Sequence, residues 1–306
     1  MSSLAITAEN LSKTYGKEKL VAVDTLSFTV EEGEIFGLIG PDGAGKTSLF
    51  RMLTTLLLPD SGSASVGGHD IVKGYAEIRK TVGYMPGRFS LYQDLSVEEN
   101  LNFFATLFKT TVEENYHLIK DIYEQLAPFK KRRAGKLSGG MKQKLALCCA
   151  LIHQPTILFL DEPTTGVDPV SRKEFWAMLY RLKEKGITIL VSTPYMDEAT
   201  RCDRIALIQQ GKILSIDTPE NISSQFGDTL YEVKGGKMSR LLKTILAYDQ
   251  TKSAYAYGDA VHLTLHTNAN AVDDLEDFLN HKGISSPQVR EIKPSVEDCF
   301  IKMLKQ

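Results

Sequence analysis

Eight consecutive residues, 40–47, carry the clearest chemical pattern in the chain. They fit G-x-x-x-x-G-K-[ST], the spacing of a loop that wraps around phosphate groups. Glycines let such a loop curl until successive backbone N–H groups point inward at an anion. Lys46 is placed to reach the β- and γ-phosphates of a nucleotide, and the Thr47 hydroxyl to bind Mg²⁺. The predicted phosphate-binding residues are Gly40, Pro41, Asp42, Gly43, Ala44, Gly45, Lys46, Thr47 and Ser48.

Two adjacent carboxylates, Asp161 and Glu162, form the second chemical pattern. They follow four apolar residues, 157–160, that are typical of a buried strand. Ligands of open α/β sheets bind at the carboxyl ends of the strands, so we expect both carboxylates at such a site. Asp161 could hold Mg²⁺, and Glu162 could accept a proton from an attacking water. Together with the phosphate loop, this pattern predicts nucleotide hydrolysis.

Alternating strand-like and helical segments must position these residues. Residues 34–39, directly before the phosphate loop, are typical of a buried strand, and residues 48–53 after it are typical of a starting helix. Similar alternation up to about residue 225 predicts an α/β architecture. The expected strands are Ala5–Leu11, Ala22–Val30, Ile35–Ile39, Val82–Met85, Ile157–Leu160, Ile187–Ser192 and Ile205–Gln209.

The chain is predicted to form two domains, residues 1–225 and residues 228–306. Within the first, apolar spacing near 3.6 indicates a helical insertion at about 97–150. The second is predicted as a small β-α-β-β-α-β unit of the split βαβ kind. Its expected strands are Leu230–Lys234, Ser253–Tyr257, Val261–Thr267 and Gln288–Lys293, its expected helices Ser239–Ala247, Ala271–Lys282 and Ser295–Leu304, and Ser295 with Asp298 an expected capping box.

The composition of the chain argues against several classes of protein, including nucleic-acid-binding and membrane-spanning ones. The net charge of −2 gives no general attraction to nucleic acid, so no nucleic-acid partner is expected. No apolar run of about 18 residues is found, so we expect no membrane span, and residues 1–6 lack the pattern of a signal peptide. Four cysteines without C-x-x-C spacing argue against a zinc site and fit a reducing cytoplasm.

A further motif carries a resemblance to a known family. With Leu137, Ser138, Gly139, Gly140 and Met141 standing upstream of Asp161, residues 4 to about 222 resemble the ATP-binding subunits of ABC transporters. The resemblance implies ATP and Mg²⁺ as cofactors. It also implies a P-loop NTPase fold of the ABC ATPase type, with a mixed sheet core, an antiparallel β subdomain and a helical insertion.

The resemblance also implies roles for single residues. The segment 137–141 would grip ATP bound to a partner subunit, and Asp168 would lie in a loop that contacts that subunit across the dimer. Tyr15 would stack on adenine, although an ordinary tyrosine at a strand end would look the same in the sequence. Thr47 and Asp161 would hold Mg²⁺, and Glu162 would be the catalytic base.

Segments 85–92, 95–101 and 192–199, with the tail 294–301, are similar to the branch that serves ABC-2 exporters, including multidrug efflux ATPase subunits. That branch implies an integral membrane permease and a second ATPase subunit, the same chain or another, as partners. It also implies a cytoplasmic protein, peripheral on the inner face of the plasma membrane. The permease would contact the helical insertion and residues 87–99.

Two positions depart from the family pattern. Gly87 stands where the family has a glutamine that touches Mg²⁺ and the attacking water, and Pro194 stands where it has a histidine that bonds to the γ-phosphate. We hypothesise an asymmetric ATPase pair in which this site turns over slowly. The alternatives are a homodimer that tolerates both residues, a non-hydrolysing nucleotide-dependent scaffold, and a soluble ABC-type ATPase acting on ribosomes or DNA.

Overall fold

The computed structural model describes residues 3–266 and 271–305. The chain divides into two compact units, residues 1–219 and residues 220–306. The sequence placed the end of the first domain at 225, but residues 220–225 group with the second unit. One reason is that the Cys299 thiol donates to the backbone oxygen of Ile222, at 3.2 Å.

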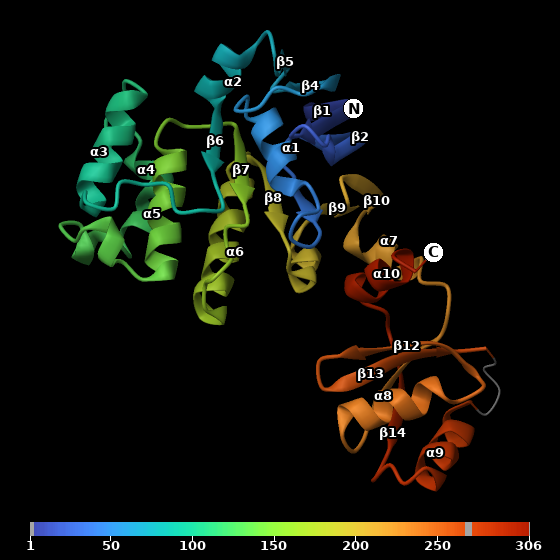
Figure 1. Ribbon diagram of the computed structural model, residues 1–306. Helices are drawn as coiled ribbons and strands as arrows, with labels where there is room; N and C mark the ends of the chain where they lie inside the picture. Colours follow the sequence, from blue (N-terminus) through green and yellow to red (C-terminus); the bar gives the residue numbers. More distant parts are fainter. Residues whose placement is uncertain (1–2, 267–270, 306) are drawn as a thin grey trace. The chain divides into compact units, whose positions relative to one another are not determined.

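The first unit contains two sheets and their helices (Figure 1). The strands are β1 (Leu4–Tyr15), β2 (Leu20–Glu31), β3 (Ile35–Ile39), β4 (Ser61–Val66), β5 (His69–Asp70), β6 (Val82–Met85), β7 (Ile157–Asp161), β8 (Thr188–Thr193), β9 (Arg204–Gln209) and β10 (Lys212–Asp217). The helices are α1 (Lys46–Leu53), α2 (Tyr75–Thr81), α3 (Val97–Leu107), α4 (Tyr116–Tyr123), α5 (Gly139–Leu151) and α6 (Pro169–Glu184), with 3-10 turns at Ala127–Phe129, Ala134–Lys136 and Met196–Arg201.

The larger sheet of this unit has the strand order β10-β9-β3-β8-β7-β6. From β9 to β6 all neighbours run parallel, and β10 joins antiparallel. Every residue of β3, β7 and β8 is buried, as expected for parallel strands covered on both faces. The continuous apolar runs that predicted these strands reflect that double burial.

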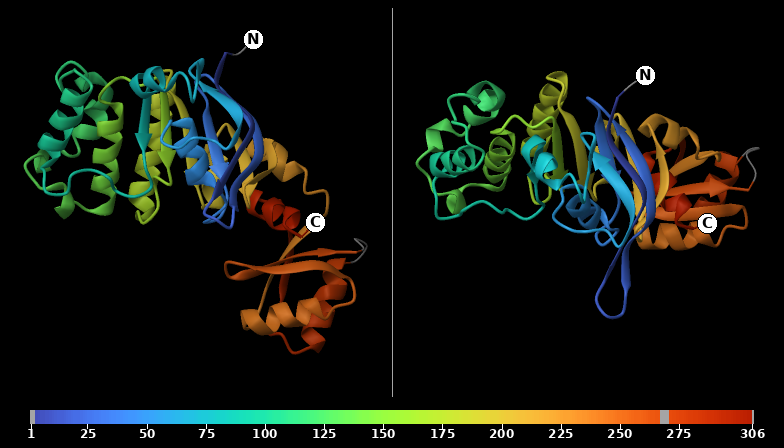
Figure 2. Two further views of the ribbon diagram at one scale, coloured as in Figure 1. Left: turned by 45° about the horizontal axis from the view of Figure 1, so that its top comes forward. Right: turned by 90° about the horizontal axis from the view of Figure 1, so that it is seen from above.

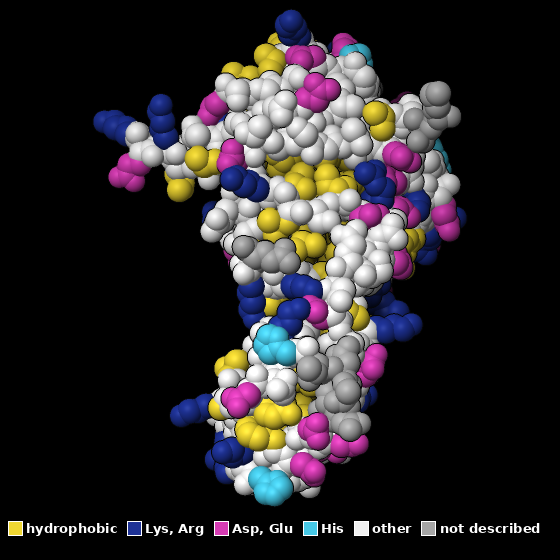
Figure 3. Space-filling view, turned by 90° about the vertical axis from the view of Figure 1, so that its right-hand side faces the viewer, with side chains coloured by type: hydrophobic (Ala, Val, Ile, Leu, Met, Phe, Trp, Pro, Cys, Tyr) yellow, Lys and Arg dark blue, Asp and Glu magenta, His cyan; other side chains and the backbone are white. Residues whose placement is uncertain are grey.

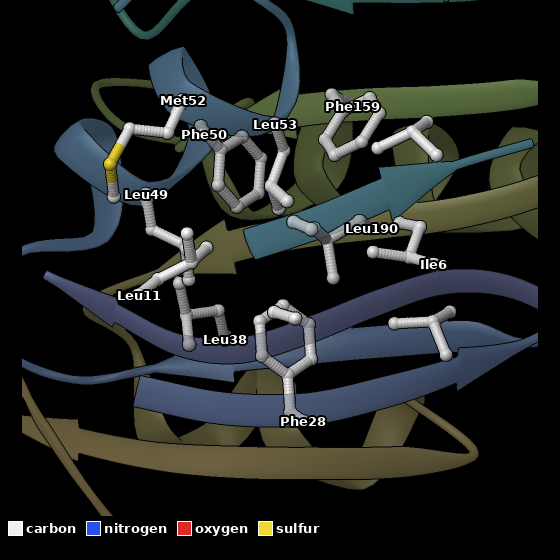
Figure 4. Packing of buried hydrophobic residues seen from close by; sticks show 14 of the residues in the cluster. Ile6, Leu11, Phe28, Leu38, Leu49, Phe50, Met52, Leu53, Phe159 and Leu190 are labelled. Atoms are coloured by element: carbon white, nitrogen blue, oxygen red, sulfur yellow. The ribbon is translucent and has the colours of Figure 1, made fainter. Parts of the chain in front are cut away.

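The smaller sheet, β2-β1-β4-β5, is antiparallel and packs with α1 and the larger sheet around one hydrophobic core. Figure 4 shows side chains of α1, including Phe50, meeting side chains from strands of both sheets. The Phe50 and Phe159 rings meet edge to face with centroids 5.7 Å apart. This core holds the start of α1, and therefore the phosphate loop, at the carboxyl end of β3.

Helices α3, α4 and α5 form the insertion predicted at about 97–150 and lie beside the strand β6 (Figure 2). Ser96 and Glu99 close a capping box at the start of α3, which fixes where that helix begins. Ser138 caps α5, which packs against both α3 and α4.

On the face drawn in Figure 3, exposed hydrophobic side chains lie in separate patches bordered by charged ones.

The second unit contains β11 (Leu230–Lys234), β12 (Thr251–Tyr257), β13 (Ala260–Leu265), β14 (Gln288–Ile292), α7 (Pro219–Ser224), α8 (Met238–Leu246), α9 (Ala271–His281) and α10 (Val296–Met303). Its sheet order is β12-β13-β11-β14 and every pair is antiparallel. Because β11 and β12 both flank β13, β11-α8-β12 is a split βαβ unit, and the Ser295–Asp298 capping box is present. The predicted strand end at Thr267 lies outside the described residues.

Candidate functional site

The phosphate loop lies between the end of β3 and the start of α1, as the sequence predicted. Gly40 begins it and donates its backbone N–H to the oxygen of Thr193, 3.2 Å away. Gly43 and Gly45 have φ values of 78° and 105°, which L-residues rarely adopt. A Cβ atom on Gly40 or Gly45 would lie 2.2 Å from a backbone oxygen. The glycines are therefore required by the curl of the loop and by its close packing.

The Lys46 side chain is buried, and its ammonium group lies at the opening of the phosphate loop. Its Nζ donates to the backbone oxygens of Gly40, at 2.8 Å, and Pro41, at 3.0 Å. The same Nζ lies 3.1 Å from Glu162 Oε1. Among the described residues its partners are carbonyl and carboxylate oxygens, and a lysine at a helix N-terminus suits the binding of a further anion.

Asp161 joins the phosphate loop to the strand β8. The Thr47 hydroxyl donates to Asp161 Oδ2, at 2.8 Å, and the Ser192 hydroxyl donates to Asp161 Oδ1, at 2.6 Å. Burial and the negative charge of Asp161 raise the pKa of the neighbouring Tyr84 to about 12. The hydroxyl and carboxylate oxygens of Thr47 and Asp161 are the ligand type that Mg²⁺ prefers, so this pair fits the predicted metal site.

Glu162 follows β7 with a left-handed backbone, at φ 50°. Its backbone N–H donates to both the carbonyl and the hydroxyl oxygen of Ser192, each at 3.0 Å. Non-glycine residues in this conformation store strain and occur preferentially at functional sites. Here the turn brings the Glu162 carboxylate back to Lys46. The geometry brings together Lys46, Thr47, Asp161 and Glu162, as the sequence predicted.

Ser192 is a site residue that the sequence reasoning did not single out. It contacts both acidic residues through one hydroxyl, yet it lies thirty residues further along the chain. The only signal available was its position at the end of an apolar strand beside the one that carries Asp161. Carboxyl ends of neighbouring parallel strands meet at one edge of a sheet, so that position predicts proximity.

The two unusual positions also lie at this site. Gly87 follows β6, and a Cβ atom on it would lie 3.0 Å from the backbone oxygen of Asp161. Pro194 follows β8 and offers no N–H donor. The segment after Pro194 is anchored by buried Glu198, whose carboxylate accepts from Thr164, at 2.8 Å, and from Thr193, at 2.7 Å.

Tyr15 lies at the end of β1, and its hydroxyl is 3.1 Å from the Ser48 hydroxyl of the phosphate loop. Its side chain is 38% exposed. An aromatic ring that is exposed and tethered beside the loop suits a contact with a nucleotide base.

The segment 137–141 caps a different helix. Ser138 is the N-cap of α5, and its hydroxyl accepts from the backbone N–H of Met141 at 3.4 Å. Asp168 caps α6, because its carboxylate accepts from the N–H groups of Val170 and Ser171 at 3.1 and 3.0 Å. Among the described residues, no hydrogen bond or ion pair joins residues 137–141 to Lys46, Thr47 or Asp161.

Comparison with known proteins agrees with this geometry. A family model described as "ABC transporter" matches residues 23–165. Doxorubicin resistance ATP-binding protein DrrA of Mycobacterium tuberculosis is 40% identical over 75% of this chain and 70% of its own length. The chain belongs to the ABC transporter family, among its ATP-binding proteins.

A second relative in this family is the probable multidrug ABC transporter ATP-binding protein YbhF of Escherichia coli, 40% identical over 99% of the chain. The chain spans about half, 53%, of that protein's length. Among solved structures, cbiO1 from Clostridium perfringens, part of the ABC transporter complex cbiONQ, has a TM-score of 0.64 and 25% identity. That match covers 72% of this chain and 91% of cbiO1, and it confirms the ABC ATPase fold.

No described helix is both long enough and apolar enough to cross a membrane. All four cysteines are free and buried, and burial raises the pKa of Cys148. The described residues contain no group of three or more His, Cys, Asp or Glu side chains placed to hold a metal ion. Mg²⁺ usually keeps several waters and binds substrate phosphates, so Thr47 and Asp161 would supply part of its ligands.

Proposed function

We propose that this chain is the ATP-binding and ATP-hydrolysing subunit of a membrane exporter and that it drives a separate permease. The observation that carries the hydrolytic part of the proposal is the distance of 3.1 Å between Lys46 Nζ and Glu162 Oε1, at the opening of the phosphate loop; the export role is supported by the relatives' names. This distance supports a role for Lys46 as the cation that would bind phosphate, next to Glu162 as the carboxylate that would accept a proton from water.

The contacts of Lys46 suggest how binding prepares the base. Its ammonium group is shared between loop carbonyls and Glu162. Phosphate oxygens entering the loop would compete for that ammonium, which frees the Glu162 carboxylate to hold the attacking water. Asp161 and Thr47 would hold Mg²⁺, whose charge offsets that of the phosphates when it is bound. The Ser192 hydroxyl would keep the Asp161 carboxylate and the Glu162 backbone in place.

Substitution of the base tests hydrolysis. In Glu162→Gln we expect ATP turnover by the purified chain to fall by about 10²–10⁴-fold. Binding of a fluorescent ATP analogue should persist, because the loop and Asp161 are intact. Lys46→Ala is the control that loses binding itself. Unchanged turnover in Glu162→Gln would remove Glu162 from the reaction.

The proposed permease contact is the insertion with residues 87–99. Three large apolar side chains there are exposed: Tyr92 at 50%, Phe103 at 40% and Leu107 at 61%. A cavity of about 180 Å³ lies between β6, α3 and α5, and it is lined by the sequence neighbours of these side chains, Leu91, Phe104 and Phe108. Exposed apolar side chains beside a cavity favour a protein partner. The proposed location is accordingly cytoplasmic, on the inner face of the plasma membrane.

A finer proposal concerns the partner ATPase. We infer that this chain is the slower half of an asymmetric pair, because Gly87 and Pro194 remove two side chains that would position water and phosphate. Loss of one aligned hydrogen-bond donor costs about 10²–10³ in rate. The segment 137–141, with Asp168 beside it, would then complete the site of a second ATPase subunit. Rapid turnover by the purified chain alone would contradict this.

A further inference from the structure

The second unit has a sheet face that its two long helices do not cover. Val261 and Leu263 of β13 pack in a core with α8 and α9. The residues that alternate with them, His262 and Thr264, therefore lie on the opposite face. Figure 1 shows α7 and α10 on that side of the sheet. The second face thus carries His262 and Thr264 of β13, and α7 and α10 lie on its side of the sheet.

A cavity of about 310 Å³ lies on this face, between α10, β12, β13 and residues 226–228. Its size falls at the lower end of the roughly 300–1,000 Å³ typical of small-molecule sites. Phe226, Ile301 and the ring of Tyr255 give it apolar walls. The hydroxyls of Ser253 and Thr264, 2.9 Å apart, add groups that both donate and accept hydrogen bonds.

The charge of the cavity is unbalanced. Three lysines line it, Lys252, Lys302 and Lys305, against one carboxylate, Asp228. Asp228 accepts from Lys252 and from Lys302, both at 2.7 Å, and these bonds lower its pKa. Lys305 has no acidic partner in the part of the chain that is described; its Nζ lies 5.2 Å from the centroid of the Tyr255 ring. The lining therefore carries two positive charges in excess.

The Tyr255 ring, which forms an aromatic wall of the cavity, is held in place through its hydroxyl group. The Tyr255 hydroxyl donates to Asp298 Oδ1 at 2.6 Å, and the same oxygen is 2.6 Å from His262 Nδ1. Asp298 and His262 are both buried. A ring whose hydroxyl is held by a buried network keeps one orientation, so its face is a preformed surface for a flat ligand.

We propose that this cavity binds a small, soluble organic anion with a flat apolar body, its acidic group on Lys305 and Lys252 and its body against Tyr255 and Phe226. The excess of cations selects the anion, and the aromatic walls select the body. A bare divalent cation is disfavoured, because lysines outnumber carboxylates. The proposal stands apart from the proposed function, since every residue it uses lies in the second unit.

The test uses 1-naphthoate and 1-naphthyl phosphate as probes, with 1-naphthalenemethanol as the neutral analogue, and measures binding to the full chain by fluorescence anisotropy. We expect both anions to bind about tenfold or more tighter than the alcohol. Lys305→Glu should weaken anion binding by about tenfold or more, because it replaces the lysine ammonium with a carboxylate, which repels the anion.

Two control variants locate the site. Lys282→Glu makes the same charge change at another lysine of the second unit, one that also lies near an aromatic ring, 5.5 Å from that of Phe278. Lys46→Ala tests whether the probes bind at the phosphate loop instead, because it removes the lysine of that loop. Both should keep the affinity of the unaltered chain, and thermal unfolding should confirm that Lys305→Glu is folded.

Several results would overturn the proposal: no binding of either anion, equal binding of the alcohol, unchanged affinity in Lys305→Glu, or loss of binding in Lys46→Ala. Phosphatidylglycerol vesicles provide a separate arm. If the vesicles bind the chain in a Lys305-dependent way while the soluble probes do not, the occupant is a lipid headgroup, and the assignment to a soluble anion fails.

Discussion

The Ser192 hydroxyl contacts both acidic residues of the candidate site, the side chain of Asp161 and the backbone of Glu162. It donates to Asp161 and accepts from the backbone N–H of Glu162. A carboxylate whose partner is removed becomes free to rotate, and misplacement of a reacting group costs rate rather than binding. We therefore propose that Ser192 is a positioning residue, which would act on the reaction through Asp161 and Glu162.

Ser192→Ala should lower the ATP turnover of the chain by about 10-fold to 100-fold, since Asp161 loses one of its two hydroxyl donors and the Glu162 backbone N–H loses one of its two acceptors. Nucleotide affinity should change little, because Lys46 and the loop are untouched. Steady-state assays that separate kcat from KM check this. Ser65→Ala, which removes a hydroxyl paired with Thr7 at 2.7 Å, is the matched control. A rise in KM with kcat unchanged would refute the positioning role.

Ser192 and Glu198 show which contacts of the candidate site could not be predicted from the sequence. Lys46, Thr47, Asp161 and Glu162 belong to contiguous motifs, so local spacing predicted them and the structure brings them together. Ser192 bonds to Asp161, about thirty residues away, and Glu198 accepts from Thr164, also about thirty residues away, as well as from nearby Thr193. Their roles depend on which strands become neighbours, and that order is set by packing of the whole sheet.

At the scale of elements, the helices α5 and α6 meet at a position where a side chain does not fit. A Cβ atom on Gly140 would lie 2.7 Å from the Ser171 hydroxyl oxygen and 2.9 Å from its Cβ. This contact fixes the distance between the helix capped by Ser138 and the helix capped by Asp168. Both capped ends belong to the surface proposed for the partner ATPase.

Gly140→Ala should destabilise the first unit. Overpacking costs about 1–3 kcal/mol, which outweighs the gain of about 1 kcal/mol from replacing a helical glycine. Adding Ser171→Gly removes the clashing atoms, so the double variant should be more stable than the sum of the single changes predicts. Urea unfolding followed by the fluorescence of the single, buried Trp176 measures all three variants. Strict additivity would show that the contact is not strained.

Helix α10 is attached to its sheet by Asp298, and this attachment should depend on pH. Burial acts to raise the pKa of Asp298, but hydrogen bonds from His262, Ser295 and Tyr255 outweigh it and lower the pKa from 3.8 to about 2. A lowered folded pKa means that the stabilisation is present above about pH 4 and is lost as the pH falls toward 2.

The second unit should therefore become more susceptible to pepsin between pH 4 and pH 2, with cleavage mapped by mass spectrometry and normalised to the denatured chain. Asp298→Asn should be less stable at neutral pH and should show a flatter response in that interval. Asp259→Asn is the control, because the pKa of Asp259 is also lowered, by Lys234, but at an exposed pair. An unchanged acid response in Asp298→Asn would exclude Asp298 as the titrating group.

At the scale of the whole molecule, the fold was largely predictable and the assembly was not. Long apolar runs predicted the buried strands of the first unit, and the β-α-β-β-α-β order of the tail predicted its split βαβ unit. Those patterns are local. Whether two copies of this chain or two different subunits form the pair depends on the surfaces of the partner as well. Gly87 and Pro194 bear on that question only indirectly, through the expected rate of turnover.

The proposed asymmetry makes a prediction about association. Glu162→Gln keeps the loop, Thr47 and Asp161, so ATP that binds should persist long enough to hold two subunits together. If two copies of this chain formed the working pair, saturating Mg-ATP would convert that variant to a dimer. We expect instead a monomer by size-exclusion chromatography with light scattering, and an ATP-dependent complex only when a second ATPase subunit is supplied. Lys46→Ala, which cannot hold the nucleotide, should form neither complex. An ATP-dependent dimer of Glu162→Gln alone, together with rapid turnover by the unaltered chain, would refute the asymmetric pair and leave the homodimer as the working form.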